Sequence, residues 1–94
     1  MSLTPRQRAT LKARAHALEP VVTIGQHGAS DAVLAEIDRS LTAHGLIKVR
    51  LAGADRADRT DLAATLCAGT GAEAVQQVGR VLVLYRPRPD DEAV

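Results

Sequence analysis

The stretch Val21-Val22-Thr23-Ile24-Gly25-Gln26-His27-Gly28-Ala29-Ser30-Asp31 decides the fold. Residues 21–24 are apolar or β-branched and predict a short buried strand. Two glycines then bound a sharp turn, because a residue without a side chain tolerates the backbone angles of tight loops. Ser30 is a typical N-cap residue, and Asp31 suits the positive end of a helix dipole. The stretch therefore predicts a strand that passes through a glycine-bounded loop directly into a helix.

The residues after this loop predict that helix and then a second strand. Gly45 is the expected helix stop, and the apolar stripe of the helix consists of Val33, Ile37 and Leu41. Residues 46–51 then alternate, with Lys48 and Arg50 on one side and Ile47, Val49 and Leu51 on the other. This period of two predicts a strand with one buried face and one more polar face.

An N-terminal helix precedes the first strand. Thr4 and Gln7 have the spacing of a capping box, and Pro5 stands at the first helical position. Because Pro20 cannot continue a helix, the sequence predicts a helix from Pro5 to about Leu18.

The C-terminal part predicts a third helix followed by a β-hairpin. The helix starts near Asp55 and covers Arg56 to about Ala68. Two apolar runs, Ala74–Val78 and Val81–Tyr85, then flank the dipeptide Gly79-Arg80. Glycine at the first central position of a two-residue loop is typical of a type II′ turn.

The predicted order is α-β-α-β-α-β-β, which indicates an α/β (α+β) domain. Each strand–helix–strand unit implies a right-handed crossover, and the hairpin adds an antiparallel pair. We therefore expect a four-stranded mixed sheet with the second and third helices on one face. The first helix is expected to cover part of the other face. Residues 1–87 form the predicted domain, and residues 88–94 are expected to be an acidic, disordered tail.

Composition excludes several classes of protein. The 94 residues suffice for one domain, and Tyr85 is the sole aromatic residue, so a surface that stacks bases on several rings is excluded. The single cysteine, Cys67, excludes a disulfide framework and a multi-cysteine zinc site. No apolar run reaches the roughly 20 residues that span a bilayer, and the N-terminus is unlike a secretory signal. A soluble cytoplasmic protein with no membrane partner is expected.

Positive charge is concentrated near the N-terminus. Residues 1–28 hold four basic residues and one acid, which indicates a polyanionic partner. The loop Gly25–Gly28 would let a sugar–phosphate chain approach main-chain N–H groups, with Gln26 and His27 as exposed donors. We expect a basic stripe on the first helix to lie beside this loop and to consist of Arg8, Lys12 and His16.

The sequence resembles the CRM domain (chloroplast RNA splicing and ribosome maturation) in its stand-alone bacterial form. The similarity covers about residues 3–87. It is carried by residues 18–28, 33–37, 43–50, 70–72 and 78–86, with Leu11-Lys12 and Ala15-His16 in the first helix.

This resemblance implies an RNA-binding module whose fold is related to the C-terminal domain of a bacterial translation initiation factor. It also implies a GxxG loop like that of KH domains, and a role with the RNA of large ribosomal subunit precursors. We expect a monomer that binds RNA without a cofactor, metal or small-molecule substrate. The predicted RNA-binding residues are Gly25, Gln26, His27, Gly28, Arg6, Arg8, Lys12, Arg14, His16 and Lys48.

Other interpretations remain open at this stage. Catalysis by His27, Ser30 and Asp31 is disfavoured because Ser30 already serves as a helix cap. A metal site is disfavoured because the four candidate ligands have no close spacing: His16, His27, His44 and Cys67. A module that docks on a ribosomal protein without touching RNA is the more serious alternative, and a duplex-DNA binder is a weaker one. Steep salt dependence of binding would favour nucleic acid over protein.

Overall fold

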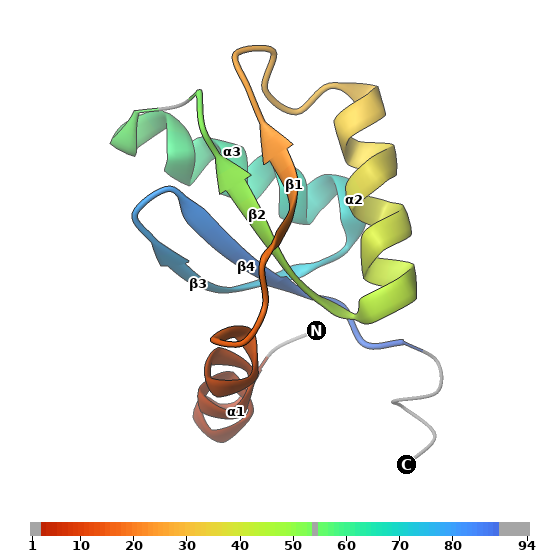
Figure 1. Cartoon of the computed structure of the whole chain (residues 1–94), viewed down its shortest axis with the longest axis vertical. Helices are drawn as coiled ribbons and strands as arrows, with labels where there is room; N and C mark the ends of the chain where they lie inside the picture. Colours follow the sequence, from red (N-terminus) through yellow and green to blue (C-terminus); the bar gives the residue numbers. More distant parts are fainter. Residues whose placement is uncertain (1–2, 54, 89–94) are drawn as a thin grey trace.

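The computed structural model describes residues 3–53 and 55–88 (Figure 1). The predicted order of elements is confirmed. The elements are α1 (Pro5–Ala15), β1 (Pro20–Ile24), α2 (Asp31–His44), β2 (Leu46–Leu51), α3 (Arg56–Thr70), β3 (Glu73–Val78) and β4 (Val81–Tyr85). Of the predicted tail, Arg88 is described and donates a hydrogen bond from Nη1 to the carbonyl of Ala43 at 3.1 Å. The remaining tail residues lie outside the described ranges.

The four strands form one mixed sheet in the order β1-β2-β4-β3. Strand β1 runs parallel to β2, while β4 is antiparallel to both β2 and β3. Strands β1 and β3 are therefore the two edges. Helices α2 and α3 pack on one face of the sheet and α1 packs on the other, as expected (Figure 1).

Most of the buried apolar surface lies between the sheet and the pair α2 and α3. Its fully buried side chains alternate along the strands as the sequence predicts, with Ile47, Val49 and Leu51 all inside. From the helices come Ile37, Leu41 and Leu66, each with no exposed surface. Full burial of such a side chain stabilises the fold by about 1.5–3 kcal/mol, so this layer holds the domain together.

A smaller apolar cluster docks α1 onto the other face of the sheet. Leu11 and Ala15 of α1 pack against Leu46, Val75 and Val83. Arg8 adds a polar anchor, because its Nη1 donates to the carbonyls of Ala74 and Val75, both at 2.8 Å. The pairing register of β3 shifts between Ala74 and Gln76, and a bulge of this kind leaves backbone groups without ladder partners.

Several element ends differ from the predicted ones. Helix α1 ends at Ala15 rather than Leu18, and a tight turn follows in which the Leu18 N–H donates to the Ala15 carbonyl at 3.0 Å. Helix α3 continues past the predicted end to Thr70. Within that helix, a Cβ on Gly69 would lie 3.0 Å from the end of the Leu34 side chain, a close contact between α3 and α2. Strands β1 and β3 each begin one residue earlier than predicted.

The start signals of the helices and the stop of α2 at Gly45 are confirmed. The Ser30 hydroxyl accepts a hydrogen bond from the Val33 N–H at 3.2 Å, and Asp55 caps α3 by accepting from the Asp58 N–H at 2.9 Å. Gly45 ends α2 with φ at 75°. Gly79 has φ at 58°, which agrees with the predicted hairpin turn.

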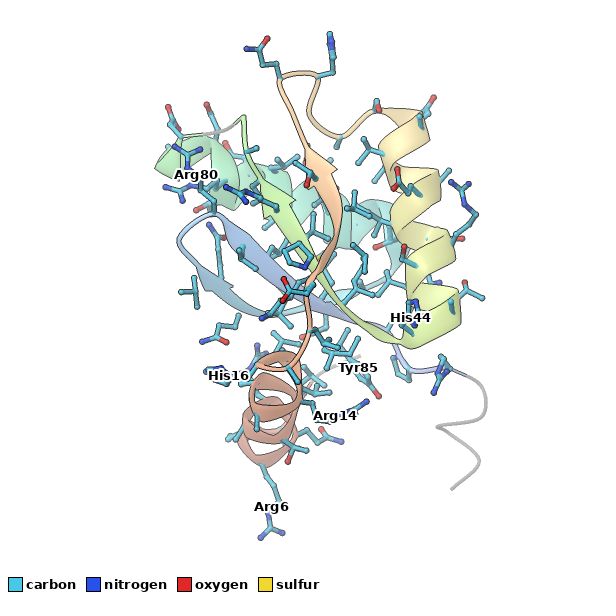
Figure 2. The ribbon with its side chains drawn as sticks, viewed as in Figure 1. Arg6, Arg14, His16, His44, Arg80 and Tyr85 are labelled. Carbon is cyan, nitrogen blue, oxygen red and sulfur yellow. The ribbon has the colours of Figure 1, made fainter. Side chains whose placement is uncertain are left out.

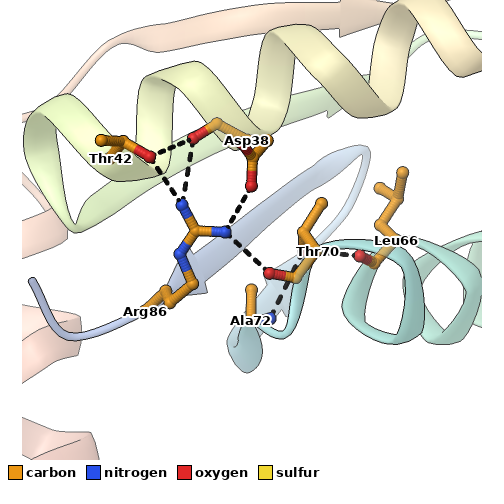
Figure 3. A network of polar contacts seen from close by, with 6 residues as sticks. All are labelled: Asp38, Thr42, Leu66, Thr70, Ala72 and Arg86. Carbon is orange, nitrogen blue, oxygen red and sulfur yellow. Dashed lines mark hydrogen bonds and ion pairs between the residues drawn. The ribbon is translucent and has the colours of Figure 1, made fainter.

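Arg86, just after β4, joins three elements by a network of hydrogen bonds (Figure 3). Its Nη1 donates to Asp38 Oδ1 at 2.7 Å and to the Thr70 carbonyl at 2.8 Å. Its Nη2 donates to the Asp38 carbonyl at 3.1 Å and to Thr42 Oγ1 at 2.9 Å. The guanidinium thus ties the end of the sheet to the middle of α2 and the end of α3.

We expect Arg86→Ala to lower the free energy of unfolding by about 1–3 kcal/mol, because it removes charge-assisted bonds and leaves the Thr70 carbonyl without its donor. Urea unfolding followed by circular dichroism measures this change. Arg39→Ala is the control, since Arg39 is exposed on α2 and forms no hydrogen bond or ion pair with the described residues. Equal stability of the two variants would contradict the structural role of the network.

Candidate nucleic-acid interface

The glycine-bounded loop forms one end of the molecule, between β1 and α2 (Figure 1). The Gly28 N–H donates to the Gly25 carbonyl at 3.2 Å, which closes the turn. Gln26 and His27 at its tip are exposed, and their side chains form no hydrogen bond with the part of the chain that the structure describes. The first turn of α2 follows directly, and the N-terminus of a helix favours negative charge. The loop therefore presents free donors beside a positive dipole end.

The two glycines of the loop have different structural needs. Gly28 has φ at +63°, a conformation that other residues rarely adopt. Gly25 has no such requirement, and a Cβ built on it would meet nothing within 4 Å. The fold therefore requires glycine at position 28 but not at position 25. Without a side chain, Gly25 leaves its backbone open to close approach by a ligand.

Gly53, two residues after β2, packs against the loop and was not among the predicted site residues. The N–H groups of Ala52 and Gly53 both donate to the Ile24 carbonyl, at 2.9 and 3.3 Å. A Cβ on Gly53 would lie 2.7 Å from the carbonyl carbon of Gly25 and 2.9 Å from the Gln26 nitrogen. The sequence feature that could have indicated Gly53 was the expected parallel pairing of the first two strands, because it places their C-terminal ends side by side.

A hollow of about 280 Å³ lies on the inner side of the loop. Asp58 and Leu62 of α3 line it together with Gly53 and the loop glycines. Because a carboxylate repels phosphate, this side is unsuited to a polyanion. The outer side of the loop, away from Asp58, is the side that suits a nucleic-acid backbone.

The expectation that α1 lies beside this loop is wrong. The two lie at opposite ends of the molecule, as Figure 1 shows. Strand β1 starts after the α1 turn and ends at the loop, and its five residues in extended conformation separate the two by about 16 Å. The basic stripe and the loop therefore do not form one compact patch.

The basic side chains of α1 do not all face the same part of the molecule. Arg8 holds the β3 backbone as described above, so we assign it a structural role in place of the expected phosphate contact. Arg6 points away from the sheet, and Arg14 lies on the flank of α1 that faces Tyr85 of β4 (Figure 2). His16, together with Lys12, lies on the opposite flank, facing the part of the sheet that α1 leaves uncovered.

That uncovered part, which we call the open sheet surface, connects the two ends of the molecule. Thr23, Arg50 and Val81 are register partners across β1, β2 and β4, and they lie on the face opposite α2 and α3. Lys48 is two residues before Arg50 on the same face, and its Nζ donates to the Leu18 carbonyl at 3.1 Å. Cations of β2 thus lie between the loop and α1.

Arg50 is a candidate site residue that the sequence analysis did not select. It is exposed and forms no hydrogen bond or ion pair within residues 3–53 and 55–88. The alternation of residues 46–51 had placed it beside Lys48 on the polar side of the strand, and that was the signal available. Its position makes it the nearest free β2 cation to the loop end of the sheet.

The family model of the CRS1/YhbY (CRM) domain matches residues 3–86 of this chain. The chain belongs to the CRM family. An RNA-binding protein of Haemophilus influenzae is 45% identical, over 92% of this chain and 87% of that one. A probable RNA-binding protein of Pseudomonas aeruginosa is 42% identical, over 95% and 86%. The solution structure of a Staphylococcus aureus protein, 32% identical, superposes with a TM-score of 0.84 and covers 99% of this chain and 97% of that one.

Among the described residues, no three His, Cys, Asp or Glu side chains gather as metal ligands. None of the described helices is both long enough and apolar enough to cross a membrane.

Cys67 packs against the larger apolar cluster of the CRM domain. Burial, and secondly the negative charge of Glu73, raise the pKa of its thiol above the ordinary value of 9.0. We expect iodoacetamide to alkylate this thiol more slowly in the folded protein than in urea at neutral pH, because the thiolate is the reactive form. Mass spectrometry of timed samples measures both rates, and equal rates would contradict the described burial.

Proposed function

We propose that this protein binds RNA of the large ribosomal subunit precursor and assists assembly of the subunit, as a cytoplasmic monomer without catalytic activity. The names of its relatives support RNA as the partner. The resemblance to bacterial CRM proteins supports the ribosomal role. The proposed contacts are made by the outer side of the loop at residues 25–28, by Lys48 and Arg50 of the open sheet surface, and by Lys12 and His16 on the flank of α1 that faces this surface.

The observation that carries this proposal is the free backbone at Gly25. Neither backbone angle nor packing requires a glycine there. Close approach of another molecule to the main-chain N–H groups would be blocked by a side chain, and a ribose–phosphate strand is a ligand that makes such an approach. The free side chains of Gln26 and His27 then add donors for phosphate or base edges.

Cross-linking in cells, followed by sequencing of the attached RNA, tests the proposal. The wild type is expected to be attached to precursor RNA of the large subunit. Gly25→Asp is expected to reduce this attachment at least tenfold, because the carboxylate would stand where phosphate approaches. The substitution itself is not expected to strain the fold, since its side chain enters open space. Attachment of both proteins at equal levels would contradict the proposed role of the loop.

A salt titration separates RNA binding from docking on a ribosomal protein. For single strands, the logarithm of the binding constant falls with the logarithm of salt concentration by about 0.7 for each phosphate contact. We expect such a steep fall for purified protein with precursor RNA. Binding to bare ribosomal protein that is insensitive to salt, with no binding to RNA, would refute the proposal.

A further inference from the structure

A groove separates the exposed flank of α1 from the open sheet surface, and no residue of the loop at 25–28 lines it. It has a volume of about 250 Å³. This lies just below the range of about 300–1,000 Å³ that is usual for small-ligand pockets, so one nucleotide-sized group matches it better than a larger cofactor does. The groove lies on the same face of the sheet as Arg50, which pairs in register with the lining residue Val81.

The floor of the groove is apolar. Val78 and Val81 are register partners on β3 and β4, and both line it. Val78 is 61% exposed. Among the described residues, it and Val21 are the large apolar residues with exposed side chains, and Val78 is the more exposed of the two. A flat apolar face laid on these valines would remove them from water, which is favourable for any exposed aliphatic surface.

The rim of the groove carries hydrogen-bond donors and positive charge. Lys12 and His16 come from α1, Lys48 from β2 and Gln76 from β3. Lys48 uses one of its donors on the Leu18 carbonyl, while Lys12, His16 and Gln76 have side chains without hydrogen bonds to the described residues. Among residues 3–53 and 55–88, no acidic side chain lines the groove. The rim is thus complementary to a phosphate.

An apolar floor, a cationic rim and an amide together match the parts of a nucleotide. The face of a base would cover the valines, and phosphate would meet the lysines. The Gln76 amide has both donors and an acceptor, so it suits the polar edge of a base. A base can enter only if it is not stacked and paired in a duplex, which is how single-stranded RNA is recognised.

We propose that this groove binds one unpaired nucleotide of the RNA whose backbone the loop holds, with its base on Val78 and Val81. This inference rests on the proposed function and extends it in one respect. The ligand is single-stranded over the stretch between the loop and α1, and Gln76 contributes base preference to it.

Fluorescence anisotropy with 12-nucleotide RNA strands tests the groove. Val78→Asp places a negative charge on its floor, and we expect affinity for single strands to fall about tenfold. Gln76→Ala is expected to change the ratio of affinities for poly(A) and poly(U) strands at least threefold. Ala64→Asp is the matched control, because it adds the same charge at an exposed position of α3, which packs on the face of the sheet opposite the groove. We expect less than a twofold change from it.

Measurement of Gly25→Asp in the same assay separates failure of the groove from failure of the proposed RNA-binding function. Weak binding by Gly25→Asp together with wild-type binding by Val78→Asp and Gln76→Ala would overturn the groove and leave the proposed function standing. Equal affinity of the wild type for a duplex and a single strand would likewise overturn the groove. Absence of RNA binding by the wild type would overturn both. Thermal unfolding of each variant shows whether an affinity loss reflects loss of fold.

Discussion

Gly53→Ala is expected to weaken RNA binding at least tenfold and to lower the free energy of unfolding by about 1–3 kcal/mol, the usual cost of forcing extra atoms into a packed site. The added methyl would lie 2.7 Å from the Gly25 carbonyl carbon, where no flexible side chain can give way. Either the loop at residues 25–28 or the end of β2 must move. Anisotropy with RNA and urea unfolding measure the two effects.

Gly25→Ala is the matched control for stability, because it adds the same methyl group to the same loop in open space. Its free energy of unfolding is expected to be the same as that of the wild type or higher by about 0.4–1 kcal/mol. The reason is that alanine restricts the conformations of the unfolded chain. If Gly53→Ala keeps wild-type stability and RNA affinity, Gly53 does not position the loop. If stability falls while affinity stays unchanged, the RNA does not need the loop in this position.

The elements could be predicted because their signals are local. Ser30 and Asp55 cap their helices, and residues 46–51 alternate in burial as their spacing indicates. Helix ends were less predictable, since their causes lie elsewhere in the chain. Helix α3, for example, continues through Gly69 to Thr70, and a Cβ on Gly69 would lie 3.0 Å from the Leu34 side chain of α2.

The candidate site was harder to predict than the fold because it depends on long-range placement. Helical spacing puts Arg8, Lys12 and His16 on one stripe, but it does not say which end of the sheet receives α1. The partners of Arg8 are carbonyls at a bulge of β3, 66 and 67 residues away. Gly53 matters only through a backbone contact with a neighbouring parallel strand. Such contacts have no pattern within a short window of sequence.

Arg50→Glu is expected to lower affinity for precursor RNA by at least tenfold at about 0.1 M salt, where charges about 10 Å apart still interact. Arg50 is an exposed cation without an ion-pair partner among the described residues, and it lies between the loop and the α1 groove. Reversal of its charge removes one phosphate contact and repels the neighbouring phosphates. The fold should keep its stability within about 0.5 kcal/mol, as is usual for surface substitutions.

Arg50→Gln and Arg39→Glu complete this experiment. Arg50→Gln removes the charge without reversing it, so a smaller loss of affinity and a salt slope shallower by about 0.7 are expected. Arg39→Glu makes the same charge reversal on α2, which packs on the opposite face of the sheet, and it should change affinity less than twofold. Equal losses from Arg39→Glu and Arg50→Glu would indicate a general effect of net charge. Wild-type affinity of Arg50→Glu would exclude the open sheet surface from the path of the RNA and leave the loop as the surviving part of the interface.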